Sequence, residues 1–336
     1  LVPGCKLGQD SNFYGHNSEA EPSENIIVLA QLHQQTVEDL LIIGNSCPLD
    51  GQQQSIQWLT DVGAKESVQW LAQLAQQNID DKNRHQAVMG ISHHDHHDSV
   101  ATLTSLAHTL DEETASSAIH GISIIDTPQR LEALSQLLDE LPGQDKRHHV
   151  VFALANLDNT KASERLMRLV KEDQSQELRH SSLFALAESN HHAVDEFLQD
   201  IILKGNNNDL QHSAVYALAE RETPAAAQRL WNILDKAETY GLNSATQGSL
   251  WYSLIELDPK VAITKAEAYL LKAEDEGVIT MVLAALADIE DHTGQHPLIA
   301  MVKAPYPAPV RRHALFHLAD SDDPTAIAEL FEIIER

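Results

Sequence analysis

The sequence predicts an all-α protein, a right-handed α-solenoid of about nine helical hairpins stacked in one array. Three observations predict this fold. A phrase centred on Ala-Leu-Ala recurs at a constant spacing, and apolar residues within each repeat follow a helical period. Hydrophobic residues make up 43% of the 336 residues, yet aromatic residues only 5%. That balance favours Leu- and Ala-rich packing of helix on helix.

The repeat is visible directly in the sequence. The phrase "VVFALANLD" at 150–158 returns as "SLFALAESN" at 182–190 and "AVYALAERE" at 214–222. Extending this spacing in both directions gives anchors separated by 32, 31, 32, 32, 32, 36, 32 and 32 residues. Such regularity identifies a tandem repeat. The anchor residues are Trp58, Gly90, Gly121, Ala153, Ala185, Ala217, Ser253, Ala285 and His317.

Each repeat is predicted to contain two helices. Leu183, Leu186 and Ala187 form one apolar stripe at helical spacing, and a second stripe follows a polar break, at 194–202. The turn residues at 205–209 end the unit. One hairpin of this size cannot bury its apolar faces alone, so neighbouring hairpins must stack.

The ends and one internal position depart from this regularity. Residues 1–50 are predicted to form an irregular segment and a capping helix, and residues 51–336 the repeat array. The longer interval between Ala217 and Ser253 indicates a small insertion. We expect a kink of the array near 238–245.

The charge of the chain restricts its partners. It has 23 Lys and Arg residues against 50 Asp and Glu residues, a net charge of −27. This excludes generic binding to nucleic acid and to anionic membranes, which needs clustered Lys and Arg. It favours a protein or peptide with basic patches. No apolar run is long enough for a transmembrane helix.

Cys5 and Cys47 are the two cysteines of the chain. They could form a disulfide that fixes the N-terminal segment, or they could be two unrelated thiols. The sequence 1–5 resembles the end of a bacterial lipoprotein signal, in which a lipidated cysteine follows a small residue. This resemblance favours an exported or periplasmic protein over a cytoplasmic one and leaves a lipid anchor undecided.

The repeat resembles the short HEAT-like repeat named after the phycobilisome lyases, over about residues 50–336. In that family the first helix opens with Val-Arg and continues into Ala-Leu-Gly. The Ala-Leu pair is found here at 153–154, 185–186, 217–218 and 285–286. The Arg six residues before the anchor is matched by Arg84, Arg147, Arg179 and Arg311. The resemblance implies the fold and leaves the function open, because such repeats serve many proteins.

Histidines recur five residues before four anchors, at His85, His148, His180 and His212. Equivalent positions of stacked repeats form a ladder, so these rings could approach one another and bind a metal. Deoxyhypusine hydroxylase is a di-iron enzyme built from similar repeats, and its motif places His-Glu after the Arg. Here Gln86, His149, Ser181 and Ser213 replace the Glu, so the hard anionic ligands of a di-iron centre are missing.

The turn after the anchor Gly90 contains a second His-rich group, with His93, His94, His96 and His97. Imidazole and carboxylate groups suit Zn, Ni or Cu, so adventitious or weak binding of a transition metal is plausible there. A defined site needs a fixed second shell, which one turn rarely provides. No cofactor is expected.

Four aromatic residues surround the insertion: Trp231, Tyr240, Trp251 and Tyr252. Trp and Tyr often anchor interfaces, so these are candidate partner-binding residues; the alternative is that they fill irregular packing beside the insertion. No phosphate loop, nucleophile elbow or zinc-protease motif is found.

The sequence therefore predicts a non-enzymatic scaffold that binds a protein or peptide on the concave surface of an acidic solenoid. The alternative is a metal-binding enzyme, similar to a hydroxylase or a lyase, that uses the histidine ladder.

Overall fold

The computed structural model describes residues 56–57, 59–60, 65–76, 81–94, 97–157, 159–205, 207–289, 293–321 and 323–334. Cys5, Cys47 and the anchor Trp58 lie outside these residues. Within them the chain forms helices and no strand. No helix in the described ranges is long and apolar enough to span a bilayer.

The helices are α4 (Lys65–Gln76), α5 (Asp81–Ser92), α6 (His97–Thr109), α7 (Glu112–Ile124), α8 (Gln129–Glu140), α9 (Gln144–Ala155), α10 (Thr160–Glu172), α11 (Gln176–Ala187), α12 (Ala193–Lys204), α13 (Asn208–Ala219), α14 (Pro224–Leu234), α15 (Ala237–Tyr240), α16 (Ser244–Leu257), α17 (Pro259–Leu270), α18 (Glu276–Ala287), α19 (Gln295–Lys303), α20 (Ala308–Ala319) and α21 (Pro324–Ile334).

These helices pair into the hairpins that the sequence predicts. The anchors from Gly90 to His317 all lie on the first helix of a hairpin, namely α5, α7, α9, α11, α13, α16, α18 and α20. The second helix of each pair follows after a short turn. The prediction of an all-α fold built from repeated helical hairpins is therefore confirmed.

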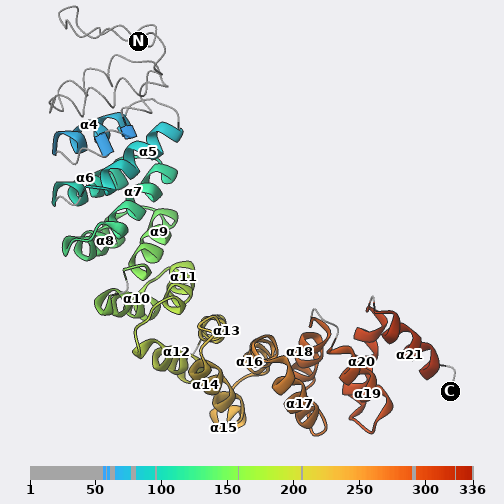
Figure 1. Ribbon diagram of the computed structural model, residues 1–336. Coiled ribbons are helices and arrows are strands. Elements are labelled where there is room, and N and C mark those ends of the chain that lie inside the picture. The colour runs from blue at the N-terminus through green and yellow to red at the C-terminus, as the bar shows by residue number, and fades with distance from the viewer. Residues whose placement is uncertain are drawn as a thin grey trace, which may run out of the picture. The chain divides into compact units, whose positions relative to one another are not determined.

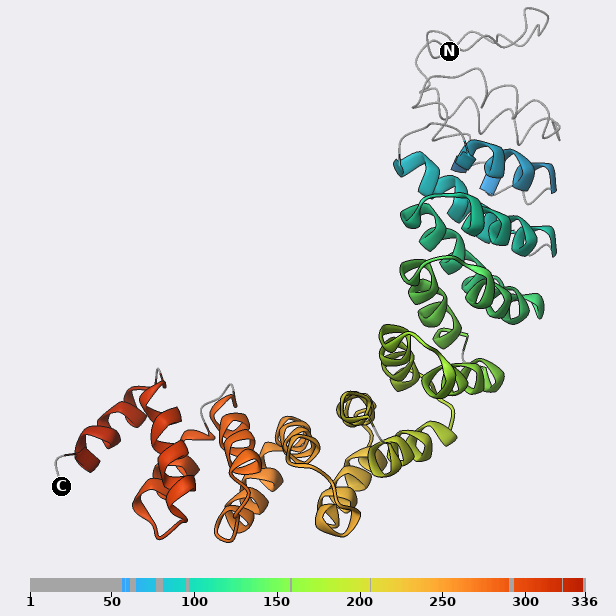
Figure 2. The same cartoon turned by 180° about the vertical axis from the view of Figure 1, so that it is seen from behind.

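The chain divides into two compact units, residues 1–165 and 166–336. In the N-terminal unit, α5, α7 and α9 pack against one another in turn, and α4, α6 and α8 form a second layer. In the C-terminal unit, the first helices from α11 to α20 likewise contact their neighbours in order. The second helices α12, α14, α17 and α19 lie on the opposite side, as both views agree, and α21 follows α20 at the end of the array (Figures 1 and 2). Each unit thus has a layer of first helices and a layer of second helices.

Small and branched apolar residues fill the space between the layers. The anchor Ala185 and the next residue, Leu186, are fully buried, as are Ala217 and Leu218. Ala at the anchor lets adjacent helices approach closely, and Leu fills the space beside it. This packing explains why the chain needs few aromatic residues.

The recurrent Arg of the first helix has a structural role. Arg147 Nε donates to the carbonyl of Leu138 at 2.9 Å, and Arg179 Nε donates to that of Val170 at 2.8 Å. Gln211 Nε2 at the same register position donates to a third such carbonyl at 2.8 Å. Carbonyls in the last turn of a helix have no partner within that helix. The side chain therefore caps the second helix of the preceding hairpin.

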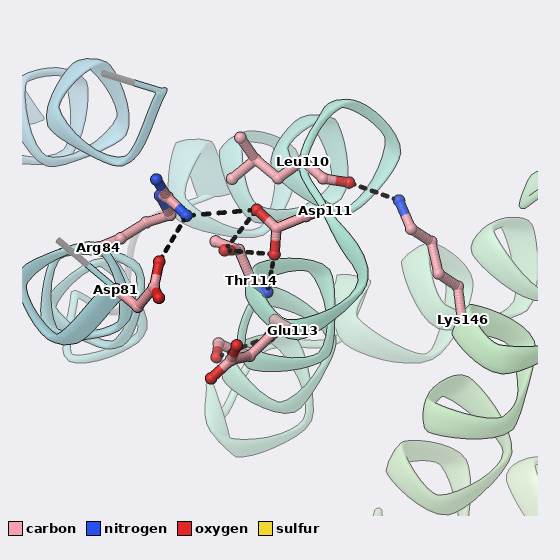
Figure 3. Close-up of polar contacts among 8 residues, drawn as sticks. Asp81, Arg84, Leu110, Asp111, Glu113, Thr114 and Lys146 are labelled. Atoms are coloured by element: carbon pink, nitrogen blue, oxygen red, sulfur yellow. Dashed lines mark hydrogen bonds and ion pairs between the residues drawn. The ribbon is translucent and has the colours of Figure 1, made fainter. Parts of the chain in front are cut away.

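Several helices begin at an Asp whose side chain accepts backbone hydrogen bonds. Asp111 accepts from the backbone N of Thr114 at 3.0 Å and from Arg84 Nη1 at 3.4 Å (Figure 3). Asp275 accepts from Ser244 Oγ at 2.6 Å and from the backbone N of Val278 at 3.1 Å. These hydrogen bonds to the charged form hold both carboxyl pKa values below the usual 3.8.

Replacing Asp111 or Asp275 with Ala is expected to lower the free energy of unfolding by about 0.5–2 kcal/mol at neutral pH, because an N-cap is lost. Since the folded pKa is depressed, this contribution is complete above 3.8 and is lost as the pH falls through the folded pKa. Urea unfolding followed by circular dichroism, from neutral pH to well below 3.8, measures it.

The matched control for these caps is Glu164→Ala, at an exposed position inside α10. It is expected to change stability by less than about 0.5 kcal/mol. Wild type and the two Asp variants should converge in acid. A difference between them that persists at low pH would contradict the capping role of the carboxylates.

The insertion between Ala217 and Ser253 is the short helix α15. It ends at Gly241, whose φ of 65° is left-handed, and the backbone N of Leu242 donates to the carbonyl of Ala237 at 3.0 Å. Glycine adopts this conformation without steric cost. The predicted position of the insertion is confirmed, and the kink near 238–245 stays a prediction.

Candidate functional site

Two of the four ladder histidines, His85 and His180, contact serines of the next repeat. His85 Nδ1 lies 2.7 Å from Ser117 Oγ, and His180 Nδ1 lies 3.2 Å from Ser213 Oγ. The same pairing with the roles exchanged joins Ser116 Oγ to His149 Nδ1 at 3.2 Å. Each contact links the position five residues before one anchor to the position four residues before the next. The ladder therefore forms hydrogen bonds between adjacent first helices.

No metal site is formed by the residues that the structure describes. No three His, Cys, Asp or Glu side chains in this part of the chain gather closely enough to hold an ion. His148 and His212 each have a buried Nε2 atom with no hydrogen-bond partner among the described residues. A metal role for the four ladder histidines stays a prediction without a ligand cluster to support it.

The residues of the second His-rich group differ in their exposure to solvent. His93 is exposed in the turn after α5, and His94 is buried. His96 lies outside the described residues, and His97 is the first residue of α6. Weak metal binding by this turn also stays a prediction.

Two of the four aromatic candidates are core residues. Trp231 and Trp251 are 9% and 3% exposed, and their rings meet edge to face with centroids 5.9 Å apart. The ring of Tyr269 lies 5.3 Å from that of Trp251, and Lys265 Nζ lies 4.2 Å from the Trp231 ring centroid. Trp231 and Trp251 thus fill the packing between α14, α16 and α17, which favours the alternative role given to them above, and partner binding by these two residues stays a prediction.

The other two candidates are accessible on different layers. Tyr240 is exposed at the end of α15, beside second helices, whereas Tyr252 is partly exposed on the first helix α16. Tyr252 lies one residue before its anchor, Ser253. The residue one position before the anchor is exposed on other first helices as well. Grouping aromatic residues by their proximity in the sequence had not revealed this.

The residue before the anchor faces solvent on successive first helices. In the C-terminal unit this position is aromatic on four of five first helices, and we call these residues the aromatic column: Phe184, Tyr216, Tyr252 and Phe316. Phe184 is 41% exposed and Phe316 is 65% exposed, while both tyrosines are partly exposed. Ala284 occupies the position on α18. In the N-terminal unit, His120 and Phe152 at this position are exposed.

Helix geometry explains why these rings are exposed. On α11, Ser182, Leu183, Ala185 and Leu186 are all buried, whereas Phe184 points away from them. Residues three or four apart share a helix face, so the exposed face also includes the position three residues after the anchor. Large aromatic side chains repeated on an exposed face are unusual in a protein surface without a binding role.

Comparison with known proteins supports the repeat assignment. Residues 68–155 and 141–219 match the family model of HEAT repeats. No match was found among the curated proteins.

Three solved structures that match this chain share 13–17% sequence identity with it. One is the complex of CpcE and CpcF of phycocyanin lyase from Nostoc sp. PCC7120 (17% identity, 80% of this chain, 100% of that chain, TM-score 0.35). Another is human deoxyhypusine hydroxylase in complex with glycerol (14% identity, 81% of this chain, 100% of that chain, TM-score 0.33). A third is Kap121p (13% identity, 83% of this chain, 37% of that chain, TM-score 0.42).

Proposed function

Because residues 68–219 are HEAT repeats, we propose that this protein is a non-enzymatic scaffold that binds another protein or peptide along its layer of first helices. One helix of every repeat contributes to that surface, so a partner can contact many repeats at once. The net charge of −27 favours a partner with basic patches and an association that weakens with salt.

The observation that carries this proposal is the aromatic column. Phe184, Tyr216, Tyr252 and Phe316 repeat at one register position and are at least partly exposed. Aromatic side chains supply much of the binding energy at protein interfaces because they bury a large apolar area with little loss of freedom. The anchors Ala185, Ala217 and Ser253 are buried and already hold the fold together, so the neighbouring rings are available to a partner.

A photo-crosslinking amino acid placed at Phe184 or Phe316 in the full chain is expected to capture a partner in the source cell. The matched control positions are Val261 and Leu271, which are exposed apolar residues of the second-helix layer. Captured proteins are identified by mass spectrometry. The capture should fall when Tyr216 and Tyr252 are both replaced with Ser, with the helical content unchanged by circular dichroism.

Equal capture from the first-helix and second-helix positions would contradict the proposal. So would the absence of any reproducible product from Phe184 and Phe316 at low salt, where charge attraction is least screened.

A further inference from the structure

A second column runs beside the aromatic one. Three residues after each anchor, every first helix of the C-terminal unit carries an exposed carboxylate. We call these residues the acidic column: Glu188, Glu220, Glu256, Asp288 and Asp320. Each lies four residues after the aromatic-column position of its helix, so the two side chains share one helix face.

None of the five carboxylates forms an ion pair within the described part of the chain. Other acids of the same unit do: Asp195 pairs with Arg221, Asp235 with Lys265 and Glu276 with Arg312. Among the described residues, no Lys or Arg forms an ion pair with the acidic column, and the one basic group that interacts with Asp288 and Asp320 is the His317 imidazole.

Helix stability does not explain the acidic column. Glu188, Glu220, Asp288 and Asp320 are the C-cap residues of their helices. The C-terminal end of a helix carries a partial negative charge, so Lys, Arg or His is favoured there and a carboxylate is unfavourable. The acidic-column carboxylates and the C-terminal ends of the first helices both contribute negative electrostatic potential, so this potential adds up along the layer of first helices.

The two columns are close across neighbouring repeats. Burial raises the pKa of Tyr252, and the charges of Asp288 and Glu256 raise it further, with a smaller effect from Tyr216. The packing agrees with this: Glu256 lies one turn after Tyr252, and α16 packs directly against α13, which carries Tyr216, and against α18, whose C-cap is Asp288. A cation over this ring would also have carboxylates within reach.

The N-terminal unit provides an internal contrast. At the corresponding position its first helices carry His93, Ile124 and Asn156, none of which is acidic. The acidic column is therefore a property of the C-terminal unit and not of the repeat itself.

We propose that the aromatic and acidic columns of the C-terminal unit together bind an extended, Lys- or Arg-rich segment of a partner protein, one cation per repeat. This inference rests on the proposed scaffold function and adds the chemistry and the register of the bound segment. Where the first helix carries a ring, the cation stacks on it by a cation–π interaction and pairs with a carboxylate. On α18, where Ala284 replaces the ring, the cation pairs with Asp288 alone. Arg suits both contacts because its planar guanidinium group can stack on a ring and donate hydrogen bonds to a carboxylate at the same time.

The helix spacing sets the register of the bound segment. Packed helices lie about 8–10 Å apart. An extended segment in the polyproline II conformation has three residues per turn and advances about 3.1 Å per residue. A basic residue at every third position of such a segment therefore reaches successive repeats with its side chain on the same side. Basic residues that are clustered together cannot reach successive repeats in this way.

Fluorescence anisotropy with the full chain tests this register. The probe is a labelled peptide that repeats Arg-Gly-Ser once per first helix of the acidic column, and a second peptide of the same composition has its arginines contiguous. We expect the spaced peptide to bind about tenfold more tightly than the clustered one. Equal affinity for the two peptides, or no binding of the spaced peptide at low salt, would overturn the inference.

Charge-neutralising variants test the acidic column itself. The triple variant Glu220→Gln, Glu256→Gln and Asp288→Asn is expected to weaken binding of the spaced peptide by about tenfold and to reduce its salt dependence. The matched control is Glu172→Gln, Glu196→Gln and Glu238→Gln, which removes the same charge from exposed positions of α10, α12 and α15. Equal losses in the two triple variants would overturn the inference, because charge alone would then govern binding.

The two proposals can fail separately. Should the acidic-column triple variant bind the spaced peptide as wild type does, while crosslinking from Phe184 and Phe316 persists, the cationic-segment inference fails and the scaffold function stands. Loss of the crosslinking signal from Phe184 and Phe316 would instead contradict the proposed scaffold function.

Discussion

Replacing Arg221 with Met is expected to lower the free energy of unfolding by about 3–5 kcal/mol. The change removes the nearest partner of the largely buried Asp195 carboxylate and the donor to three partly buried carbonyls. The Arg221 side chain is 11% exposed and pairs with Asp195, which is 16% exposed. Its Nη1 donates to the carbonyls of Leu186, Ala187 and Ser189 at 3.2, 3.0 and 2.7 Å.

This side chain connects two successive hairpins. The carbonyls of Leu186 and Ala187 belong to the last turn of α11, and that of Ser189 to the turn after it. Asp195 lies in α12, and Arg221 follows α13. Carbonyls at a helix end have no partner within the helix, so Arg221 satisfies them from the next repeat. Since the stability of a repeat array depends on contacts between neighbours, loss of this connection weakens the coupling of adjacent units.

Met has a volume similar to that of Arg, so the variant removes hydrogen bonds and charge and leaves the packing largely filled. The control is Arg229→Met, which removes an Arg that is more exposed and lies 4.0 Å from Asp195. That change is expected to cost less than about 1 kcal/mol. Urea unfolding followed by circular dichroism compares the two, and equal costs would contradict the structural role of Arg221.

A second change at Asp195 separates the buried charge from the lost hydrogen bonds. Adding Asp195→Leu to Arg221→Met is expected to recover part of the stability, because it removes a carboxylate whose remaining ion-pair partner, Arg229, lies 4.0 Å away. A double variant less stable than Arg221→Met would show that Asp195 has a further stabilising partner.

The repeat register was predictable because it is set by local packing. Buried Ala and Leu must recur at the spacing of the stacked hairpins, and this leaves a pattern such as Ala185-Leu186 and Ala217-Leu218 in the sequence. The Arg six residues before the anchor was visible for the same reason. Its partner, a carbonyl of the preceding helix, was not visible, because backbone groups leave no trace in residue identity.

The contacts of the site were harder to predict because they depend on how adjacent helices are offset. Equivalent histidines were expected to meet, yet His180 meets Ser213, which is one register position further along in the next repeat. The aromatic column was present in the phrases containing Phe184 and Tyr216. Only the burial pattern of the first helix distinguishes these exposed rings from core residues such as Trp251.

Replacing Trp251 with Ala is expected to lower the free energy of unfolding by about 3–5 kcal/mol, because the change opens a cavity in the core of the C-terminal unit. The ring packs against Trp231 with centroids 5.9 Å apart and against Tyr269 with centroids 5.3 Å apart. Urea unfolding followed by circular dichroism measures the loss. An interface role without a core role would predict lost binding at unchanged stability.

Two further variants show whether ring volume or the indole N–H is responsible for this stability. Trp251 Nε1 is buried without a hydrogen-bond partner among the described residues. Trp251→Phe removes this unsatisfied donor and keeps an aromatic ring, so we expect a cost below about 1.5 kcal/mol and unchanged partner binding. Tyr240→Ala, at the exposed end of α15, is expected to change stability by less than about 0.5 kcal/mol. If Trp251→Phe costs as much as Trp251→Ala, the stability depends on a contact of the indole itself and not on filled volume.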